Sequence, residues 1–200
     1  MIDSTRKLHL KTIKAHRKAV RKICRKMGIP LRGALHDLSK YSKEEMAICR
    51  FATGKRSPHD VAREELGYSP SWCHHAVRND HHWEHWLDIG PRKGANLTIK
   101  PVKMPYKCVI EMFCDMVGAS KTYGGNNWKP EDVWNYWINK RKAEVLMHVD
   151  SEYLLEKLFW NFYQLGEKRF YKQYREVLKP YLEKAYEGDF CKNESNLASQ

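Results

Sequence analysis

Apolar side chains recur at spacings of three and four residues along most of this chain, and no segment shows the sustained alternation of a half-buried β-strand. The pattern is clearest near the N-terminus. Ile13, His16, Val20, Ile23 and Met27 fall on one stripe, and lysine and arginine take most of the remaining positions. Such a stripe is typical of a helix that buries one face. The sequence therefore predicts an all-α fold whose first helix covers residues 4–27.

Capping residues, glycines and prolines divide the rest of the chain into further helices. Ser42-Lys43-Glu44-Glu45 is a capping box, and Ser57-Pro58 and Ser69-Pro70 each join an N-cap to a proline at the first helical position. The predicted helices cover residues 32–40, 42–54, 57–67, a histidine-rich segment from 69, 105–118, a segment from 130, 150–164 and 167–178. Residues 87–103 are rich in glycine and proline and are predicted to form a loop.

A chain of 200 residues is long enough to bury a core without disulfide staples. We expect one helical domain over residues 1–188, with a core of about residues 4–150. The helices of about residues 150–187 are expected to pack on that core, and the polar residues 189–200 to form a frayed tail.

The net charge of +12 comes entirely from residues 1–56, which hold 16 basic and 4 acidic side chains. This concentration of charge is consistent with an anionic ligand. With 42% hydrophobic residues the chain is too apolar for intrinsic disorder, yet no apolar run approaches the ~18–20 residues of a membrane-spanning helix. The N-terminus lacks a secretory signal, and none of the six cysteines forms a CxxC pair. We therefore expect a cytoplasmic protein without a membrane segment.

Several candidate metal ligands lie within apolar helical patterns. His16 is on the apolar stripe of the first helix, and His36 and Asp37 are adjacent in Leu35-His36-Asp37-Leu38-Ser39-Lys40. Glu111 and Asp115 share an apolar stripe, where a carboxylate is costly unless it is paired or bound to a cation. Imidazole nitrogen and carboxylate oxygen suit Zn²⁺, Mn²⁺, Fe and Ni²⁺. Taken alone, each of these residues could also have a structural role, as a buried core histidine, a helix cap or a member of an ion pair.

A histidine cluster follows further along the chain. Five of the ten histidines, His74, His75, His81, His82 and His85, fall within twelve residues. On an unbroken helix His75 and His82 would share a face but lie ~10.5 Å apart, too far for two imidazoles to bind one metal. Either the helix breaks at Asn79-Asp80, or the two histidines serve two metals. A solvated helix normally uses lysine and glutamate, so the cluster indicates a functional site.

The candidate ligands and the residues around them resemble the metal-dependent HD-domain superfamily. They more closely resemble DUF5662, a protein family that occurs in bacteria and their phages. The resemblance covers roughly residues 10–150 and is most specific at residues 36–40, His-Asp-Leu-Ser-Lys, and at residues 79–82, Asn-x-His-His. It implies an HD-like helical bundle in which ligands from several helices converge on one, two or three metal ions. By position it implies His16, His36, Asp37 and Asp115 as metal ligands, with His75 and one or both of His81 and His82 completing a second metal position.

The resemblance also implies a reaction. Most HD-domain enzymes hydrolyse phosphate esters, so we expect a metal-dependent phosphohydrolase acting on a nucleotide or nucleotide-like ester through metal-activated water. Asp37 would bridge two metals or orient the water, and Lys40, one turn later, would neutralise a phosphate oxygen. Arg78 and Arg32 are further candidates for phosphate binding, and Asn79 would position substrate or cap a broken helix. The expected cofactor is one or two divalent transition metal ions, with Mn, Fe, Zn, Ni and Co all compatible.

Two alternatives remain compatible with the sequence. The first is an HD-type di-iron oxygenase, whose four histidines and two aspartates would be His16, His36, Asp37, His75, His82 and Asp115. The second is a non-enzymatic protein whose basic first helix and tryptophans bind single-stranded nucleic acid by charge and stacking. The tryptophans also fall at helical spacings, which suits a place in the core.

Overall fold

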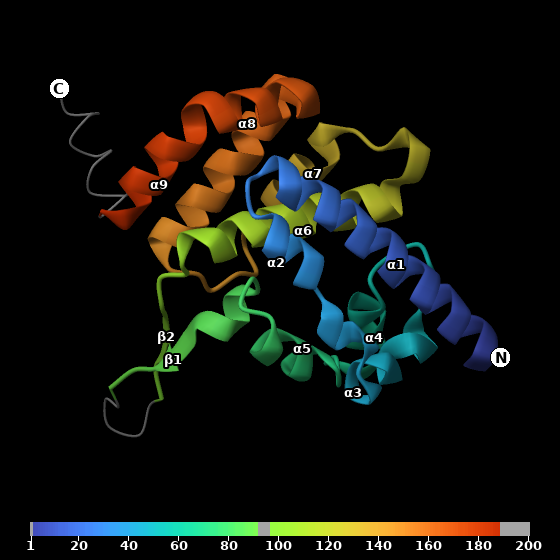
Figure 1. The fold of residues 1–200 in the computed structure, drawn as a ribbon. Coiled ribbons are helices and arrows are strands. Elements are labelled where there is room, and N and C mark those ends of the chain that lie inside the picture. The colour runs from blue at the N-terminus through green and yellow to red at the C-terminus, as the bar shows by residue number, and fades with distance from the viewer. Residues whose placement is uncertain (1, 92–96, 189–200) are drawn as a thin grey trace.

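The computed structural model describes residues 2–91 and 97–188 and is predominantly helical (Figure 1). The predicted tail at residues 189–200 lies outside the described residues. The helices are α1 (Ile2–Lys26), α2 (Pro30–Leu35), α3 (Lys43–Met46), α4 (Pro58–Leu66), α5 (Trp72–Arg78), α6 (Tyr106–Gly124), α7 (Pro130–Tyr136), α8 (Val149–Gln173) and α9 (Lys179–Glu187). In Figure 1, α6 crosses the middle of the molecule, α8 and α9 lie on one side of it, and α3, α4 and α5 lie on the other.

One apolar core joins the N-terminal and C-terminal helices. It includes Val20 of α1, Phe113 of α6, Phe159 and Phe162 of α8, and Leu182 of α9. Gly118 allows α1 and α6 to approach closely, because a Cβ at this position would lie 2.5 Å from Cγ2 of Val20. This contact places the apolar stripe of α1, including His16, directly against α6. No helix in the described parts of the chain is long and apolar enough to cross a membrane.

The predicted helix over residues 32–40 is wrong. Helix α2 starts at Pro30 and ends at Leu35, because His36 leaves the helical conformation with φ −45° and ψ 128°. Asp37 then takes a left-handed conformation with φ 55°. Residues Leu38–Tyr41 form a short 3₁₀ turn instead of continuing the helix. The left-handed region is uncommon for residues other than glycine, although aspartate tolerates it better than most. This break sets the direction of two predicted metal ligands.

Four other boundaries differ from the prediction. The loop at 87–103 contains a small antiparallel pair, β1 (Leu87–Ile89) and β2 (Ile99–Pro101). The helix predicted to end near Gly54 ends at Met46 and continues as a 3₁₀ turn to Phe51. Helix α5 begins after Ser71 rather than after Ser69. Helix α6 runs through Gly118 to Gly124, since Gly118 serves helix packing rather than helix termination.

Other predicted signals are confirmed. Ser57 caps α4 by accepting a hydrogen bond from the His59 amide, and Gly67 ends that helix with φ 78°. The predicted break between residues 164 and 167 falls at Gly166, whose φ of 69° interrupts α8. The cysteines in the described residues, Cys24, Cys49, Cys73, Cys108 and Cys114, are free thiols.

Candidate metal centre

Four of the predicted ligands meet where α1, α6 and the turn after α2 come together. The Nε2 atoms of His16 and His36 are 3.3 Å apart. Asp37 Oδ2 lies 3.3 Å from the first of these atoms and 3.2 Å from the second. Asp115 Oδ1 lies 2.9 Å from His16 Nε2 and 3.3 Å from His36 Nε2. His16, His36, Asp37 and Asp115 are called the first donor group below.

The spacing of the first donor group fits a metal ion. Donor atoms bound at about 2.1 Å to one ion lie roughly 3.0 Å apart at right angles and roughly 3.4 Å apart in a tetrahedron. The separations of 2.9–3.3 Å fall close to this range. Asp37 is completely buried, and neither of its carboxylate oxygens has a hydrogen-bond partner of normal geometry among the described residues. A buried carboxylate of this kind requires compensation by a cation, and Lys40 supplies a positive charge at Oδ2 only.

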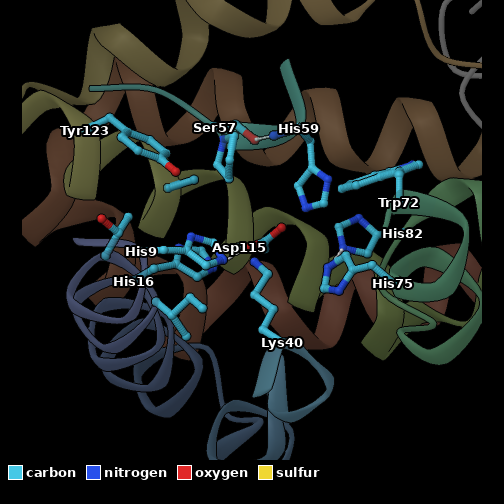
Figure 2. Close-up of a pocket in the computed structure, with 14 residues that line it drawn as sticks. His9, His16, Lys40, Ser57, His59, Trp72, His75, His82, Asp115 and Tyr123 are labelled. Carbon is cyan, nitrogen blue, oxygen red and sulfur yellow. Dashed lines mark hydrogen bonds and ion pairs between the residues drawn. The ribbon is translucent and has the colours of Figure 1, made fainter. Parts of the chain in front are cut away.

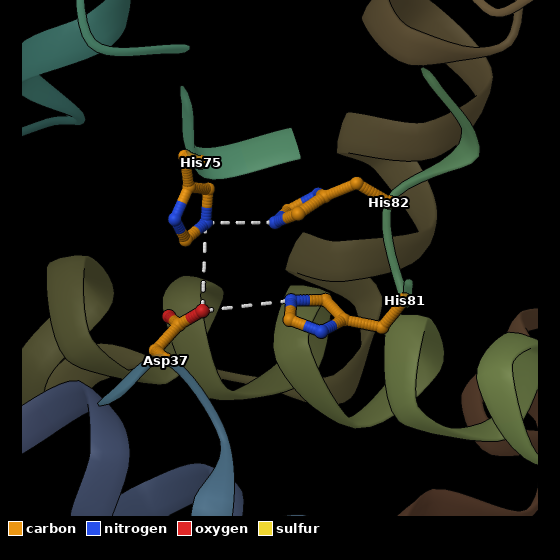
Figure 3. Close-up of side chains that lie close together, drawn as sticks. All are labelled: Asp37, His75, His81 and His82. Atoms are coloured by element: carbon orange, nitrogen blue, oxygen red, sulfur yellow. Dashed lines mark hydrogen bonds and ion pairs between the residues drawn. The ribbon is translucent and has the colours of Figure 1, made fainter. Parts of the chain in front are cut away.

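A second donor group lies on the other oxygen of Asp37 (Figure 3). Asp37 Oδ1 is 3.4 Å from His75 Nε2 and 3.6 Å from His81 Nε2. His82 Nε2 is 2.9 Å from His75 Nε2. His81 Nε2 is buried and has no hydrogen-bond partner in the described structure. Asp37, His75, His81 and His82 therefore form a second group that could hold a metal ion, and Asp37 is common to both groups.

A break in the helix brings His75 and His82 together. Helix α5 ends at Arg78, and Asn79 is extended with φ −124° and ψ 98°. The chain therefore turns back after Asn79, and two rings that a straight helix would hold ~10.5 Å apart come into contact. The Asn79 amide donates to the carbonyl of His75 at 2.7 Å and to Ser39 Oγ at 2.8 Å, which secures this turn.

Two buried glutamates orient the histidines. Glu111 Oε1 accepts a hydrogen bond from His36 Nδ1 at 2.9 Å and lies 3.4 Å from His81 Nδ1. Glu45 Oε2 accepts from His75 Nδ1 at 2.6 Å. Carboxylates in this position fix the ring tautomer, so that each Nε2 lone pair faces the donor group. His36, His81 and Glu111 are also close enough to count as a third possible group, but these contacts use the Nδ1 side of the rings.

The ionisation of the buried groups favours metal binding. Burial and the neighbouring charge of His36 lower the pKa of His81 to about 4, so its ring is neutral at pH 7. Burial likewise holds the pKa of His82 well below its usual value. Burial also lowers the pKa of His36, but the charge of Asp37 and the hydrogen bonds to Asp115, Asp37 and Glu111 together outweigh burial and hold that pKa well above the usual value. His81 and His82 thus offer neutral imidazoles, whereas the carboxylates around His36 attract positive charge.

The remaining predicted site residues lie at different distances from the donor groups. Lys40 Nζ is 2.5 Å from Asp37 Oδ2, and Lys40 lines the adjacent cavity. Figure 2 shows Lys40 between the His16–Asp115 side and the His75–His82 side of this cavity. Arg32 binds Glu111 and Asp80, behind His36. Arg78 is exposed at the end of α5.

The structure adds residues that the sequence pattern did not indicate. His59 lines the cavity and is held by Ser69 Oγ, which lies 2.7 Å from its Nδ1. His9 and Tyr123 line the same cavity. Glu45 was identified only as the last residue of a capping box. Ser42 does cap the Glu45 amide, but the Glu45 side chain turns inward to His74 and His75. Only the high cost of burying a carboxylate beside histidines would have signalled this role.

Replacing Glu45 with glutamine is expected to weaken metal binding by about 10–100-fold, because the amide no longer fixes the His75 ring as a carboxylate does. The matched control is Glu44→Gln, since the Glu44 side chain is 61% exposed. Titration with Mn²⁺ or Zn²⁺ in a calorimeter measures both variants. Equal affinity in the Glu45 variant and the wild type would contradict the orienting role.

Comparison with known protein families gives a match over most of the chain. The sequence model of a family described as "Family of unknown function (DUF5662)" matches residues 5–161. The matched segment contains every member of the two donor groups, as well as Glu45, Glu111 and Lys40. No curated protein and no solved structure matches the chain.

Proposed function

The chain belongs to the DUF5662 family, and from the geometry of its buried site we propose that it is a metal-dependent phosphohydrolase acting on a nucleotide-like phosphate ester. The proposal rests on the position of Asp37, whose two carboxylate oxygens face two separate groups of donor atoms. Members of both groups line a cavity. We propose that the cofactor is a pair of divalent transition metal ions, since Mn, Fe, Zn, Ni and Co all accept such ligands. The HD-type arrangement that the sequence resembles is part of this proposal.

Each donor group would hold one ion. The first ion would be bound by His16, His36 and Asp115. The second ion would be bound by His75, His81 and His82. Asp37 would bind both ions. When bound, such ions lower the pKa of water and polarise a phosphoryl oxygen, which is the chemistry that phosphate-ester hydrolysis requires. Both oxygens of Asp37 face the donor groups, so Asp115, which lines the cavity, would hold and orient the attacking water through its carboxylate. Glu111 and Glu45 would keep the histidine lone pairs aimed at the ions.

Lys40 supports the choice of a phosphate substrate. Burial lowers the pKa of Lys40, but the charges of Asp37 and Asp115 and the hydrogen bond to Asp37 together outweigh this effect and raise the pKa to about 12, so the ammonium stays charged at neutral pH. It lines the cavity beside the donor groups and would neutralise a phosphate oxygen there. Arg32 is held by Glu111 and Asp80, so we propose that it fixes Glu111 instead of contacting substrate. Arg78 remains a predicted substrate contact. Asn79 was predicted either to position substrate or to cap the broken helix, and its amide binds Ser39 Oγ and the His75 carbonyl at that break.

The cavity has room for the organic part of the substrate. The space beside the donors is about 150 Å³ and is lined by His16, Lys40, His75 and Asp115. A neighbouring cavity of about 300 Å³ shares Trp72, His82, Asp115 and Tyr123 with it and adds Trp83, Met112, Met116 and Tyr136. Aromatic and methionine side chains suit a flat, apolar group such as a nucleobase. We therefore propose that the phosphate lies near Lys40 and the base lies toward Trp83.

The proposal is tested with purified protein loaded with Mn²⁺, Fe²⁺ or Zn²⁺ and a set of nucleoside monophosphates, diphosphates and cyclic phosphates. Release of phosphate or opening of a cyclic ester, lost after treatment with a chelator and restored by metal, is expected. No hydrolysis by any metal-loaded form would overturn the proposal. Consumption of oxygen with an organic substrate by the iron form would favour the di-iron oxygenase instead, because the same four histidines and two aspartates are present.

The free cysteines bear on the cellular location of the protein. Cys24, Cys49, Cys73, Cys108 and Cys114 are free thiols, which suits a reducing environment. We therefore propose that the protein acts in the cytoplasm, where nucleotide-like phosphates are available.

A further inference from the structure

The outer face of α1 carries a continuous basic stripe. Lys11, Lys14, Lys18, Lys22 and Arg25 follow one another at spacings of three and four residues, and all five are exposed. They lie opposite the buried stripe that carries His16. No acidic residue occurs between Asp3 and Asp37 in the sequence. None of the five side chains has an ion pair with a described residue, so their charges are not neutralised by the fold.

A basic groove begins where this stripe ends. The groove has a volume of about 620 Å³ and lies between α1, the later part of α6 and the later part of α8. Its lining consists of Lys22, Lys26, Lys121, Glu167, Lys168, Tyr171, Lys172 and Arg175. Glu167 is the one carboxylate among these lining residues. It already pairs with Lys121 at 2.6 Å and with Lys26 at 3.3 Å. The groove therefore keeps a large excess of positive charge.

The stripe and the groove form one surface, since Lys22 belongs to both. From Lys11 to Arg25 the stripe extends about 21 Å along the helix at a rise of ~1.5 Å per residue. A nucleic acid strand carries one phosphate per ~3.4 Å, so this length matches about six nucleotides before the groove is added. A small phosphorylated ligand would occupy only a part of such a surface.

We propose that this surface, called the basic track, binds the phosphate backbone of a nucleic acid at a site separate from the metal centre. The track consists mainly of lysines, which act as point charges and impose little geometric selection. No tryptophan is among the residues that line the groove, and the one aromatic ring there, Tyr171, is buried, so base stacking in the groove does not contribute. Binding is therefore electrostatic, independent of sequence and strongly dependent on salt.

The test measures binding of a labelled DNA oligonucleotide, as a single strand and as a duplex, by fluorescence anisotropy with chelator present. With about five phosphate contacts, affinity should fall about 10²-fold between about 50 and 200 mM salt. The variant Lys18→Gln/Lys22→Gln/Lys172→Gln should bind about tenfold more weakly and lower the salt slope by about 2. The control Lys100→Gln/Lys107→Gln/Lys184→Gln removes three exposed charges elsewhere and should change affinity less than about twofold.

Binding of either DNA form with this pattern supports the proposal. Equal weakening in both triple variants would overturn it, because net charge rather than the track would then determine affinity. Absence of binding at low salt would also overturn it. Since chelator is present throughout, failure of the phosphohydrolase proposal leaves this result unaffected.

Discussion

Replacing Asp37 with asparagine is expected to abolish hydrolysis, with a loss of at least about 10³-fold in turnover. An asparagine amide has one oxygen with lone pairs, so it can serve one donor group but not both. Asparagine also tolerates the left-handed conformation at this position better than alanine would, which limits the effect on folding. The rise in melting temperature on adding Mn²⁺ should be reduced or lost, because ligands that bind the folded state stabilise it.

The matched control is Asp150→Asn. Asp150 is 5% exposed and pairs with Lys103 at 2.8 Å, so it is also a buried carboxylate with a lysine partner, but it belongs to neither donor group. This variant should lose stability while keeping its metal and its turnover. Metal content and activity of the Asp37 variant equal to those of the wild type would refute the assignment of Asp37.

Replacing Lys40 with glutamine is expected to lower phosphatase turnover about 10²-fold, the ~3 kcal/mol typical of one lost charge-stabilising contact in a dry site. Metal affinity should be unchanged or higher, since a positive charge 2.5 Å from Asp37 Oδ2 is removed. Lys40→Arg should recover part of the activity because the charge is kept. The exposed Lys43 lies close by in the sequence, and Lys43→Gln serves as the control that should leave turnover unchanged.

Steady-state kinetics and metal analysis of these three variants decide the role of Lys40. A fall in turnover that arginine does not reverse, accompanied by loss of metal, would show that Lys40 only supports the structure. Wild-type turnover in the glutamine variant would remove Lys40 from the mechanism.

The helices were predictable because their signals are local. Ser57 and Pro58 at the start of α4, Gly67 at its end and the apolar stripe of α1 each act within a few residues. The exceptions involve contacts between distant segments. Gly118 looks like a helix terminator in the sequence, but it lies inside α6 because Val20 of α1 packs against it. The strand pair β1–β2 is too short to produce a recognisable alternation.

The donor residues were recognisable by type and by setting, but their arrangement was not. The structure brings together all seven predicted ligands, His16, His36, Asp37, His75, His81, His82 and Asp115. Sequence spacing gave no means of dividing the two oxygens of Asp37 between two groups, because this depends on the left-handed turn that ends α2 early. Glu45 and His59 were missed because a capping residue and an isolated histidine have common structural roles.

We propose that two ions share Asp37. The most direct measurement combines metal analysis with the electron paramagnetic resonance spectrum of the protein loaded with Mn²⁺. We expect two Mn²⁺ ions per chain and the spectrum of a magnetically coupled pair, which is typical of ions joined by one carboxylate. A single bound ion with an uncoupled six-line spectrum, or no bound Mn²⁺ at all, would contradict it.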